Sequence, residues 1–145
     1  MPDDDAPLPR LRQTVLDTTD ARGLAEFYRQ LLGLAYRPGD EPPAPGEDDP
    51  LGRDWLVLVD AGGDRRLAFQ QVAALEPVTW PEGGVAQQLH LDLSVASAEE
   101  LAAQHQRVLD LGARLLLDGI DNPEEPIRIY ADPAGHPFCL FVSHS

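Results

Sequence analysis

The sequence predicts an α+β fold made of two tandem halves, each with the order strand, helix, strand, strand, strand. Three observations support this prediction. In each half, an apolar strand segment is followed by a helical pattern that ends at a glycine. After each helix come short β-type segments separated by turn residues. The 145 residues, 43% of them hydrophobic, are enough for one packed domain and exclude wholesale disorder.

The first half begins with an expected strand at residues 11–19, after which Asp20 is placed to cap a helix. The helix carries an apolar stripe at i, i+3, i+4 and i+7 spacing, formed by Leu24, Phe27, Tyr28 and Leu31. Gly33 lies where a left-handed residue would end this helix. The segments that follow are a short strand, a mobile Pro- and Gly-rich loop, and two strands joined by a turn, at residues 34–37, 38–53, 55–60 and 66–72.

The second half repeats this order. Residues 88–95 alternate strictly between polar and apolar, so the side chains of His90 and Asp92 share the face opposite the leucines. Ser97-x-x-Glu100 is a capping box at the start of the next helix, and a glycine marks the end of that helix. Three further strands are expected at residues 113–117, 126–131 and 138–142.

These segments predict one domain at residues 10–145, preceded by a flexible acidic tail at residues 1–9. The first module covers about residues 10–72, a linker about 73–86, and the second module about 87–143. Each module places its helix on one face of a curved, mostly antiparallel sheet. The other sheet face is then solvated, covered by a partner, or curled into a cavity.

The charge of the chain bears on its partners. The net charge is −14, and all 11 basic residues are arginine. A surface this acidic repels phosphate backbones, which argues against nucleic-acid binding. It would attract a cationic ligand, although solubility is the simpler explanation of the charge.

The sequence also bears on where the protein works. No apolar run approaches the roughly 20 residues of a membrane helix, and the acidic N-terminus does not resemble a signal peptide. Cys139 is the single cysteine, so no intrachain disulfide can form. We therefore expect a cytoplasmic protein without membrane contact.

Three segments stand out for their order and spacing. They are Asp20 through Phe27-Tyr28 to Leu32-Gly33, then His90-Leu91-Asp92-Leu93, and finally Asp132-Pro133-Ala134-Gly135 with the strand after it. Together they resemble the vicinal oxygen chelate (VOC) superfamily, which includes glyoxalase I, bleomycin-resistance and fosfomycin-resistance proteins, and extradiol dioxygenases. The chain is most similar to the small bacterial glyoxalase-like group. The resemblance implies two βαβββ modules in a U-shaped sheet around a small-molecule cavity, with the helices outside, and often a homodimer.

In metal-dependent members of the superfamily, the first and last strands of each module hold a divalent ion. The matching positions here are Gln13 and His90 on the first strands, and Ala68 and Cys139 on the last strands. Gln13 and His90 suit the family pattern, but Cys139 stands where glutamate is usual. Hard ions such as Mn²⁺ prefer anionic carboxylates, and both expected carboxylates are missing. We therefore expect that no cofactor is required.

A metal-bound alternative stays open. Gln13, His90 and Cys139 could hold Zn²⁺, although this set is one ligand short of a closed tetrahedral site. Asp92 shares the strand face of His90 and could substitute for the missing ligand. The cofactor in that case would be a divalent metal such as Zn, Ni, Mn or Fe.

The expected small-molecule site lies on the same sheet face. Gln70 shares the face of the last-strand ligand position, and Asp17 and Asp92 are predicted to occupy equivalent places in the two modules. Trp55 and Phe141 could line a pocket for a flat ligand, although aromatic residues in strands more often belong to the core. The full ligand-binding set is Gln13, Asp17, Trp55, Gln70, His90, Asp92, Cys139 and Phe141.

No catalytic residue is assigned. His90 and Cys139 could act as a nucleophilic pair, since both are expected to face the cavity. A hydrogen-bonded histidine and a simply buried cysteine explain the same residues without catalysis.

These observations predict a protein that binds a small molecule in the sheet cavity without an obligate metal, of a drug-binding or ligand-sensing type. One alternative is a metal-dependent lyase, isomerase or dioxygenase-like enzyme that uses Gln13 and His90. Another is an interaction module whose open sheet face is filled by a partner protein.

Overall fold

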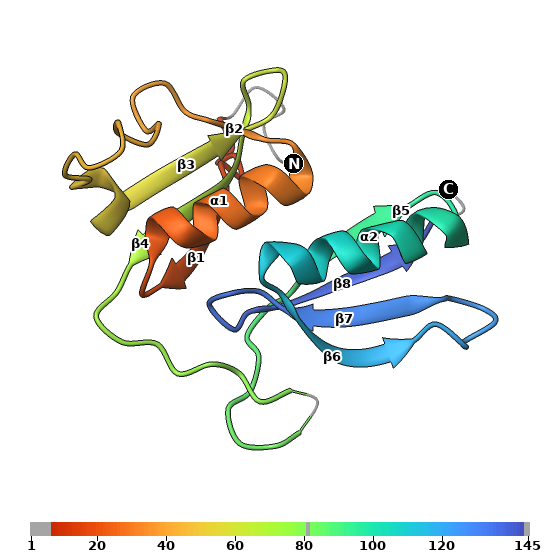
Figure 1. Cartoon of the computed structure of the whole chain (residues 1–145). Helices are drawn as coiled ribbons and strands as arrows, with labels where there is room; N and C mark the ends of the chain where they lie inside the picture. Colours follow the sequence, from red (N-terminus) through yellow and green to blue (C-terminus); the bar gives the residue numbers. More distant parts are fainter. Residues whose placement is uncertain (1–6, 81, 144–145) are drawn as a thin grey trace.

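The computed structural model describes residues 7–80 and 82–143, and it contains two βαβββ modules in tandem (Figure 1). The first module consists of β1 (Thr14–Thr18), α1 (Ala21–Leu32), β2 (Ala35–Tyr36), the 3₁₀ turn η1 (Leu51–Arg53), β3 (Trp55–Val59) and β4 (Arg65–Gln71). The second consists of β5 (Leu91–Val95), α2 (Ala98–Leu111), β6 (Arg114–Gly119), β7 (Ile127–Ala131) and β8 (Pro137–Val142). The predicted α+β fold of two tandem modules is confirmed.

Each module builds its own four-stranded sheet. The strand orders are β1-β4-β3-β2 and β5-β8-β7-β6, so the two sheets have the same topology. The first and last strands of each module pair in parallel, and the other pairs are antiparallel. Thr14 pairs with Leu67 in the first sheet as Leu91 pairs with Phe138 in the second, which fixes how residues correspond between the modules.

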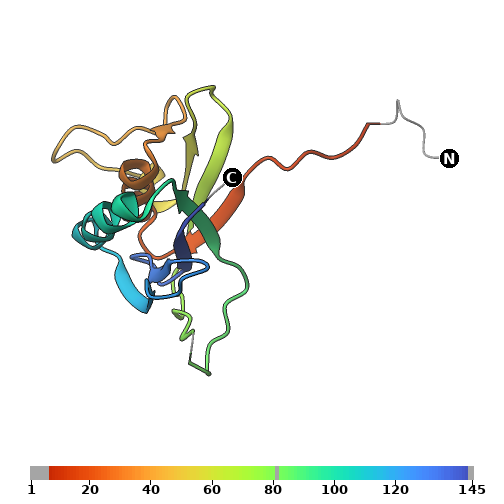
Figure 2. The ribbon, with the colours of Figure 1, turned by 90° about the vertical axis from the view of Figure 1, so that its right-hand side faces the viewer.

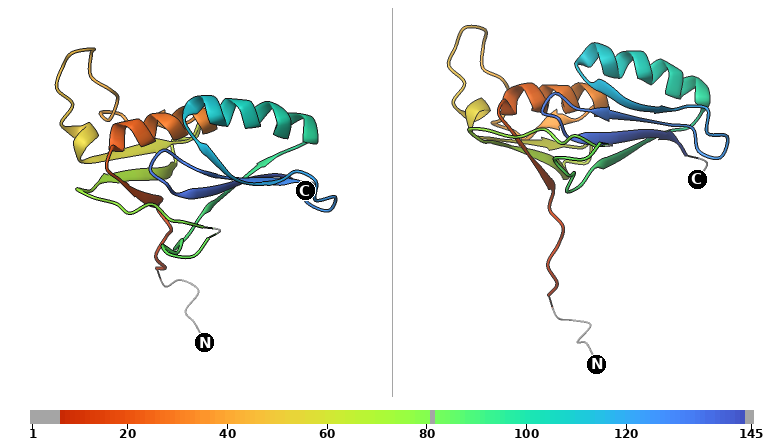
Figure 3. Two further views of the ribbon diagram at one scale, coloured as in Figure 1. Left: turned by 60° about the horizontal axis from the view of Figure 1, so that its bottom comes forward. Right: turned by 90° about the horizontal axis from the view of Figure 1, so that it is seen from below.

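The helices cover one face of the two sheets, and the linker crosses the other (Figure 3). The helix-facing side chains of both sheets and the inward stripes of both helices form one hydrophobic core. Its largest fully buried members are Tyr28, Tyr130, Phe69, Phe138, Leu24, Leu56, Leu58 and Leu101. Because the core is one-sided, the opposite sheet face is available for binding.

Local signals fix both helices where the sequence predicts them. The side chain of Asp20 accepts a hydrogen bond from the Gly23 amide, and Gly33 ends α1 with a φ of 68°. Ser97 accepts from the Glu100 amide in the same way at the start of α2. The left-handed φ of Gly33 is strained for a residue with a Cβ, so glycine is the natural residue at this end of the helix.

The Asp132-Pro133-Ala134-Gly135 turn joins the two modules. The Tyr28 hydroxyl of α1 donates to Asp132 Oδ2 at 2.6 Å, and Asp132 Oδ1 accepts from the amides of Ala134 and His136. The His136 Nε2 lies 2.6 Å from the carbonyl oxygen of Asp17 in β1. The turn between β7 and β8 is therefore fastened to both α1 and β1 of the other module.

The first strand of each module begins three residues later than the sequence predicts. Those expected at residues 11–19 and 88–95 begin only at Thr14 and Leu91, so Gln13 and His90 each lie one residue before a strand. In the second sheet, the residue opposite His90 would be Pro137, which has no amide hydrogen for the ladder. Both expected metal-ligand positions therefore lie just before the first residue of a strand.

The loop at residues 38–53 is anchored to α1, which its composition did not reveal. Arg22 makes an ion pair with Asp49 at 2.8 Å and donates to the carbonyl oxygen of Asp40. The Asp40 carboxylate in turn accepts from the Val57 amide of β3.

At the N-terminus, residues 7–13 leave the body as an extended arm (Figure 2), and residues 1–6 of the predicted flexible tail lie outside the described residues. No helix within the described part of the chain is long and apolar enough to cross a membrane.

Candidate functional site

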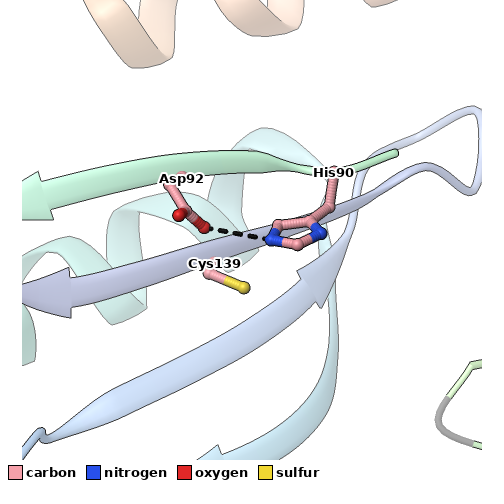
Figure 4. A group of neighbouring side chains, drawn as sticks. All are labelled: His90, Asp92 and Cys139. Atoms are coloured by element: carbon pink, nitrogen blue, oxygen red, sulfur yellow. Dashed lines mark ion pairs between the residues drawn. The ribbon is translucent and has the colours of Figure 1, made fainter. Parts of the chain in front are cut away.

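Three potential metal-binding side chains meet on the open face of the second sheet (Figure 4). The parallel register of β5 and β8 sets Asp92 directly beside Cys139, and His90 precedes Asp92 by one pleat on the same face. The His90 Nε2 lies 3.2 Å from Asp92 Oδ1. One donor atom from each of the three residues lies within 4.8 Å of the other two. We call this group the His90–Asp92–Cys139 cluster.

The cluster is half open to water. Cys139 is 8% exposed, whereas the side chains of His90 and Asp92 are 42% and 61% exposed. Burial, together with the neighbouring Asp92 carboxylate, raises the pKa of the Cys139 thiol to about 11. The free thiol therefore stays protonated at neutral pH and is a poor nucleophile, which argues against the His90 and Cys139 nucleophilic pair.

The strand register tests the expected metal positions residue by residue. It aligns Gln13 with His90 and Ala68 with Cys139, as the sequence comparison of the two modules predicts. Ala68 offers no donor atom and is fully buried. With neither last-strand carboxylate present, the four positions do not fit a hard ion such as Mn²⁺.

The His90–Asp92–Cys139 cluster offers a different set of donors. A ring nitrogen, a carboxylate oxygen and a thiol sulfur suit a borderline ion such as Zn²⁺, with a fourth position left open. Gln13 is not part of this cluster. Its side chain borders a separate hollow together with Asp92, and its buried Oε1 has no hydrogen-bond partner among the residues that the structure describes.

A larger groove of about 540 Å³ crosses the open face of the first sheet. Its floor includes Val15 and Asp17 of β1 and Gln70 of β4, and Asp17 pairs directly with Gln70. The linker forms one wall through residues 75–78, 85–86 and 88–89. The turn between β7 and β8, residues 134–137, forms another. The groove has a mostly apolar lining with a few polar groups, which is typical of small-molecule sites.

The predicted ligand-binding set is thus divided between the modules. Trp55 pairs with Gln70 on β3 but does not line the groove, and Phe141 lies beside Ser94 on the second sheet. Asp17 and Asp92 are not equivalent, and this prediction is wrong. The register aligns Asp92 with Val15, and Asp17 with Ser94, because Asp17 lies two residues further along its strand.

Sequence reasoning missed the groove residues supplied by distant segments. His136 lines the groove and contacts the Asp17 backbone, although it is not in the predicted ligand-binding set. The linker residues Leu75, Pro77 and Val85 also line it. The apolar residues of the linker were the one available signal, since a fully solvated linker has no need of aliphatic side chains.

Two βαβββ modules in tandem, each with its first and last strands paired in parallel, place the chain in the class of proteins built on the VOC fold. The chain belongs to the glyoxalase-like domain family, whose model matches residues 13–141. The VOC superfamily predicted from the sequence is thereby confirmed.

Solved structures show the same fold at low sequence identity. A glyoxalase/bleomycin resistance protein/dioxygenase family enzyme from Burkholderia phytofirmans matches with a TM-score of 0.63 and 16% identity, covering 90% of this chain and 96% of that one. The fosfomycin resistance protein FosX from Listeria monocytogenes, solved with Mn(II) and sulfate, matches with a TM-score of 0.62 and 15% identity. That match covers 94% of this chain and 93% of FosX. Among proteins of curated function, none matched this chain.

Proposed function

We propose that this protein binds a small, largely apolar molecule in the groove, and that this binding requires no metal. One observation carries the proposal: Asp17 and Gln70 lie side by side on the groove floor with free side chains. Within the described residues, neither the carboxylate nor the amide makes a hydrogen bond. Two adjacent polar groups in an apolar groove are suited to orient a ligand.

The proposal that ligand binding needs no metal rests on the positions of the potential metal ligands. None of the three residues of the His90–Asp92–Cys139 cluster lines the groove. Among the described residues that line the groove, His136 is the one histidine, and its Nε2 already contacts the Asp17 carbonyl oxygen. A ligand held by Asp17 and Gln70 would therefore be bound without help from an ion.

A titration with the neutral apolar dye Nile red tests the proposal. We expect a saturable increase in fluorescence with the wild-type protein, unchanged by EDTA. Gln70→Trp places a large ring on the groove floor and should weaken dye binding about tenfold or more, equal to about 1.4 kcal/mol.

Gln30→Trp is the matched control, because it makes the same change on the exposed side of α1. The proposal is wrong if both variants weaken dye binding equally, or if EDTA abolishes binding in the wild type.

The His90–Asp92–Cys139 cluster favours a second candidate function, a metal-dependent enzyme. A bound Zn²⁺ would polarise a substrate oxygen at its open position. His90, Asp92 and Cys139 would be the residues that hold it, and Gln13 would border the same region through the hollow it shares with Asp92.

Cobalt substitution tests this candidate without an activity assay. Co²⁺ bound by Cys139 should give a sulfur-to-metal charge-transfer absorption in the near ultraviolet, which Cys139→Ser should remove. Asp54→Asn, at an exposed carboxylate outside the cluster, should leave the absorption intact. Lack of stoichiometric Co²⁺ or Zn²⁺ binding by the wild type would exclude the second candidate and leave the first untouched.

A further inference from the structure

The hollow bordered by Gln13 and Asp92 has a volume of about 320 Å³ and lies where β1, β4 and β5 begin. Three arginines line it: Arg12 from the N-terminal arm, and Arg65 and Arg66 from β4. The hollow shares no lining residue with the groove, so it is a separate site. A gathering of three cations is unexpected in a chain with 25 acidic residues and only 11 basic ones.

These three arginines have no carboxylate partner. Within the described residues, neither Arg12, Arg65 nor Arg66 forms an ion pair or a hydrogen bond with a carboxylate. Most other arginines of the chain do have a carboxylate partner, namely Arg22, Arg29, Arg37, Arg53 and Arg128. The three guanidinium groups in the hollow are therefore not paired with a carboxylate, although Asp92 also lines the hollow.

The arginines also repel one another. Arg65 is partly exposed, and its partial loss of water, with the nearby charges of Arg12 and Arg37, lowers its pKa, while the Asp40 carboxylate acts in the opposite direction. Arg37 is already neutralised by Asp40, whose carboxylate lies 3.0 Å away. The repulsion between Arg12 and Arg65 remains, and an anion placed between them would relieve it.

The other polar side chains of the hollow include a carboxylate and an amide. Asp92 is its one carboxylate, and it is engaged by His90 at 3.2 Å. Among the described residues, none donates a hydrogen bond to the buried Oε1 of Gln13. The amide of this side chain borders the hollow and carries N–H groups that can donate to an anion.

We propose that this hollow binds the phosphate-type oxyanion of a small molecule, with Arg12, Arg65 and Arg66 as its ligands. Guanidinium groups match tetrahedral oxyanions with paired N–H donors. The volume accommodates one small molecule, and the net charge of −14 disfavours a polyanionic nucleic acid. This site goes beyond ligand binding in the groove, because none of its residues lines the groove, although Asp92 also belongs to the His90–Asp92–Cys139 cluster.

Inorganic phosphate is the probe, titrated by calorimetry at constant ionic strength against the full chain. We expect saturable binding at one site. Arg65→Gln should weaken it at least about tenfold, because it removes a charge-assisted hydrogen bond. Nile red binding in the groove should not change, which separates this proposal from the previous one.

Arg10→Gln is the matched control. It removes the same charge from the N-terminal arm that carries Arg12, but Arg10 does not line the hollow. Phosphate affinity should change less than about twofold in this variant if the hollow is the site. Non-saturable phosphate binding, or an equal loss in Arg10→Gln and Arg65→Gln, would overturn the proposal.

Discussion

Asp132 shows how one residue can serve two parts of the molecule. The residue is 4% exposed, and its carboxylate accepts from Tyr28 on one oxygen and from two turn amides on the other. Burial raises its pKa despite these hydrogen bonds, and burial with the nearby Asp132 charge raises the pKa of Tyr28. The ionised carboxylate is thus kept inside the protein at an energetic cost.

This cost should appear in the pH dependence of stability. The folded protein holds the Asp132 proton more tightly than the unfolded chain, whose carboxyl has a pKa near 3.8. The stability linked to this group is therefore fully present below pH 3.8 and is lost as pH rises through the raised folded pKa.

Asp132→Asn keeps an acceptor for the turn amides but does not titrate. Urea unfolding at several pH values should show that the variant lacks this contribution, so that its stability relative to wild type increases as pH rises across that window. If the difference between the two proteins were independent of pH, the carboxyl pKa would not be raised.

Each helix begins and ends with its own local signal. Asp20 and Ser97 cap the N-termini, while Gly33 and Gly112 adopt left-handed conformations at the C-termini. These signals act over a few residues, so the sequence alone located both helices closely. Strand boundaries depend instead on a partner strand, which explains why the predicted strand at residues 88–95 is shorter in the structure.

The Ser97 cap gives a prediction for α2. Ser97→Ala removes the acceptor for the Glu100 amide at 3.2 Å and should lower the free energy of unfolding by about 1 kcal/mol, measured in urea. Ser94→Ala, at an exposed position of β5, is the matched control and should change stability by less than about 0.5 kcal/mol. Equal effects of the two changes would argue against capping.

The two modules share one core, although each has its own sheet. Phe138 of β8 contacts Phe27 and Tyr28 of α1, with ring centroids 5.9 Å and 6.3 Å apart, and stacks on Tyr130 of β7 at 5.3 Å. Arg107 of α2 donates to the last carbonyl oxygens of α1. The modules therefore depend on each other for burial of their apolar faces.

If the two modules unfold cooperatively, a destabilising substitution in one module should also increase unfolding of the other. Phe138→Ala should cost about 3–5 kcal/mol, because it opens a cavity among aromatic rings. Hydrogen exchange should then show faster opening of α1 as well as of β7 and β8, in one unfolding transition. Leu117→Ala, at a side chain that is 44% exposed, should leave α1 unchanged. Loss of protection limited to the second module would show that the modules unfold separately.

At this scale, the sequence predicted the fold better than the site. Patterns within each module were sufficient for the order of elements, and the likeness of the two halves aligned Ala68 with Cys139. The groove required segments far apart in the chain to meet, which no local pattern encodes. Likewise, the adjacency of Asp92 and Cys139 depends on the register of two strands separated by α2, β6 and β7.

The turn between β7 and β8 both fastens the modules and forms a wall of the groove. A groove assembled in this way exists only when both halves of the chain are docked. Cutting the chain between Gly83 and Gly84 should therefore yield two fragments that bind Nile red only after mixing. Bound dye would in turn strengthen their association, measurable by sedimentation with and without dye. The two fragments would then form a split sensor in which binding of the ligand is coupled to association of the fragments.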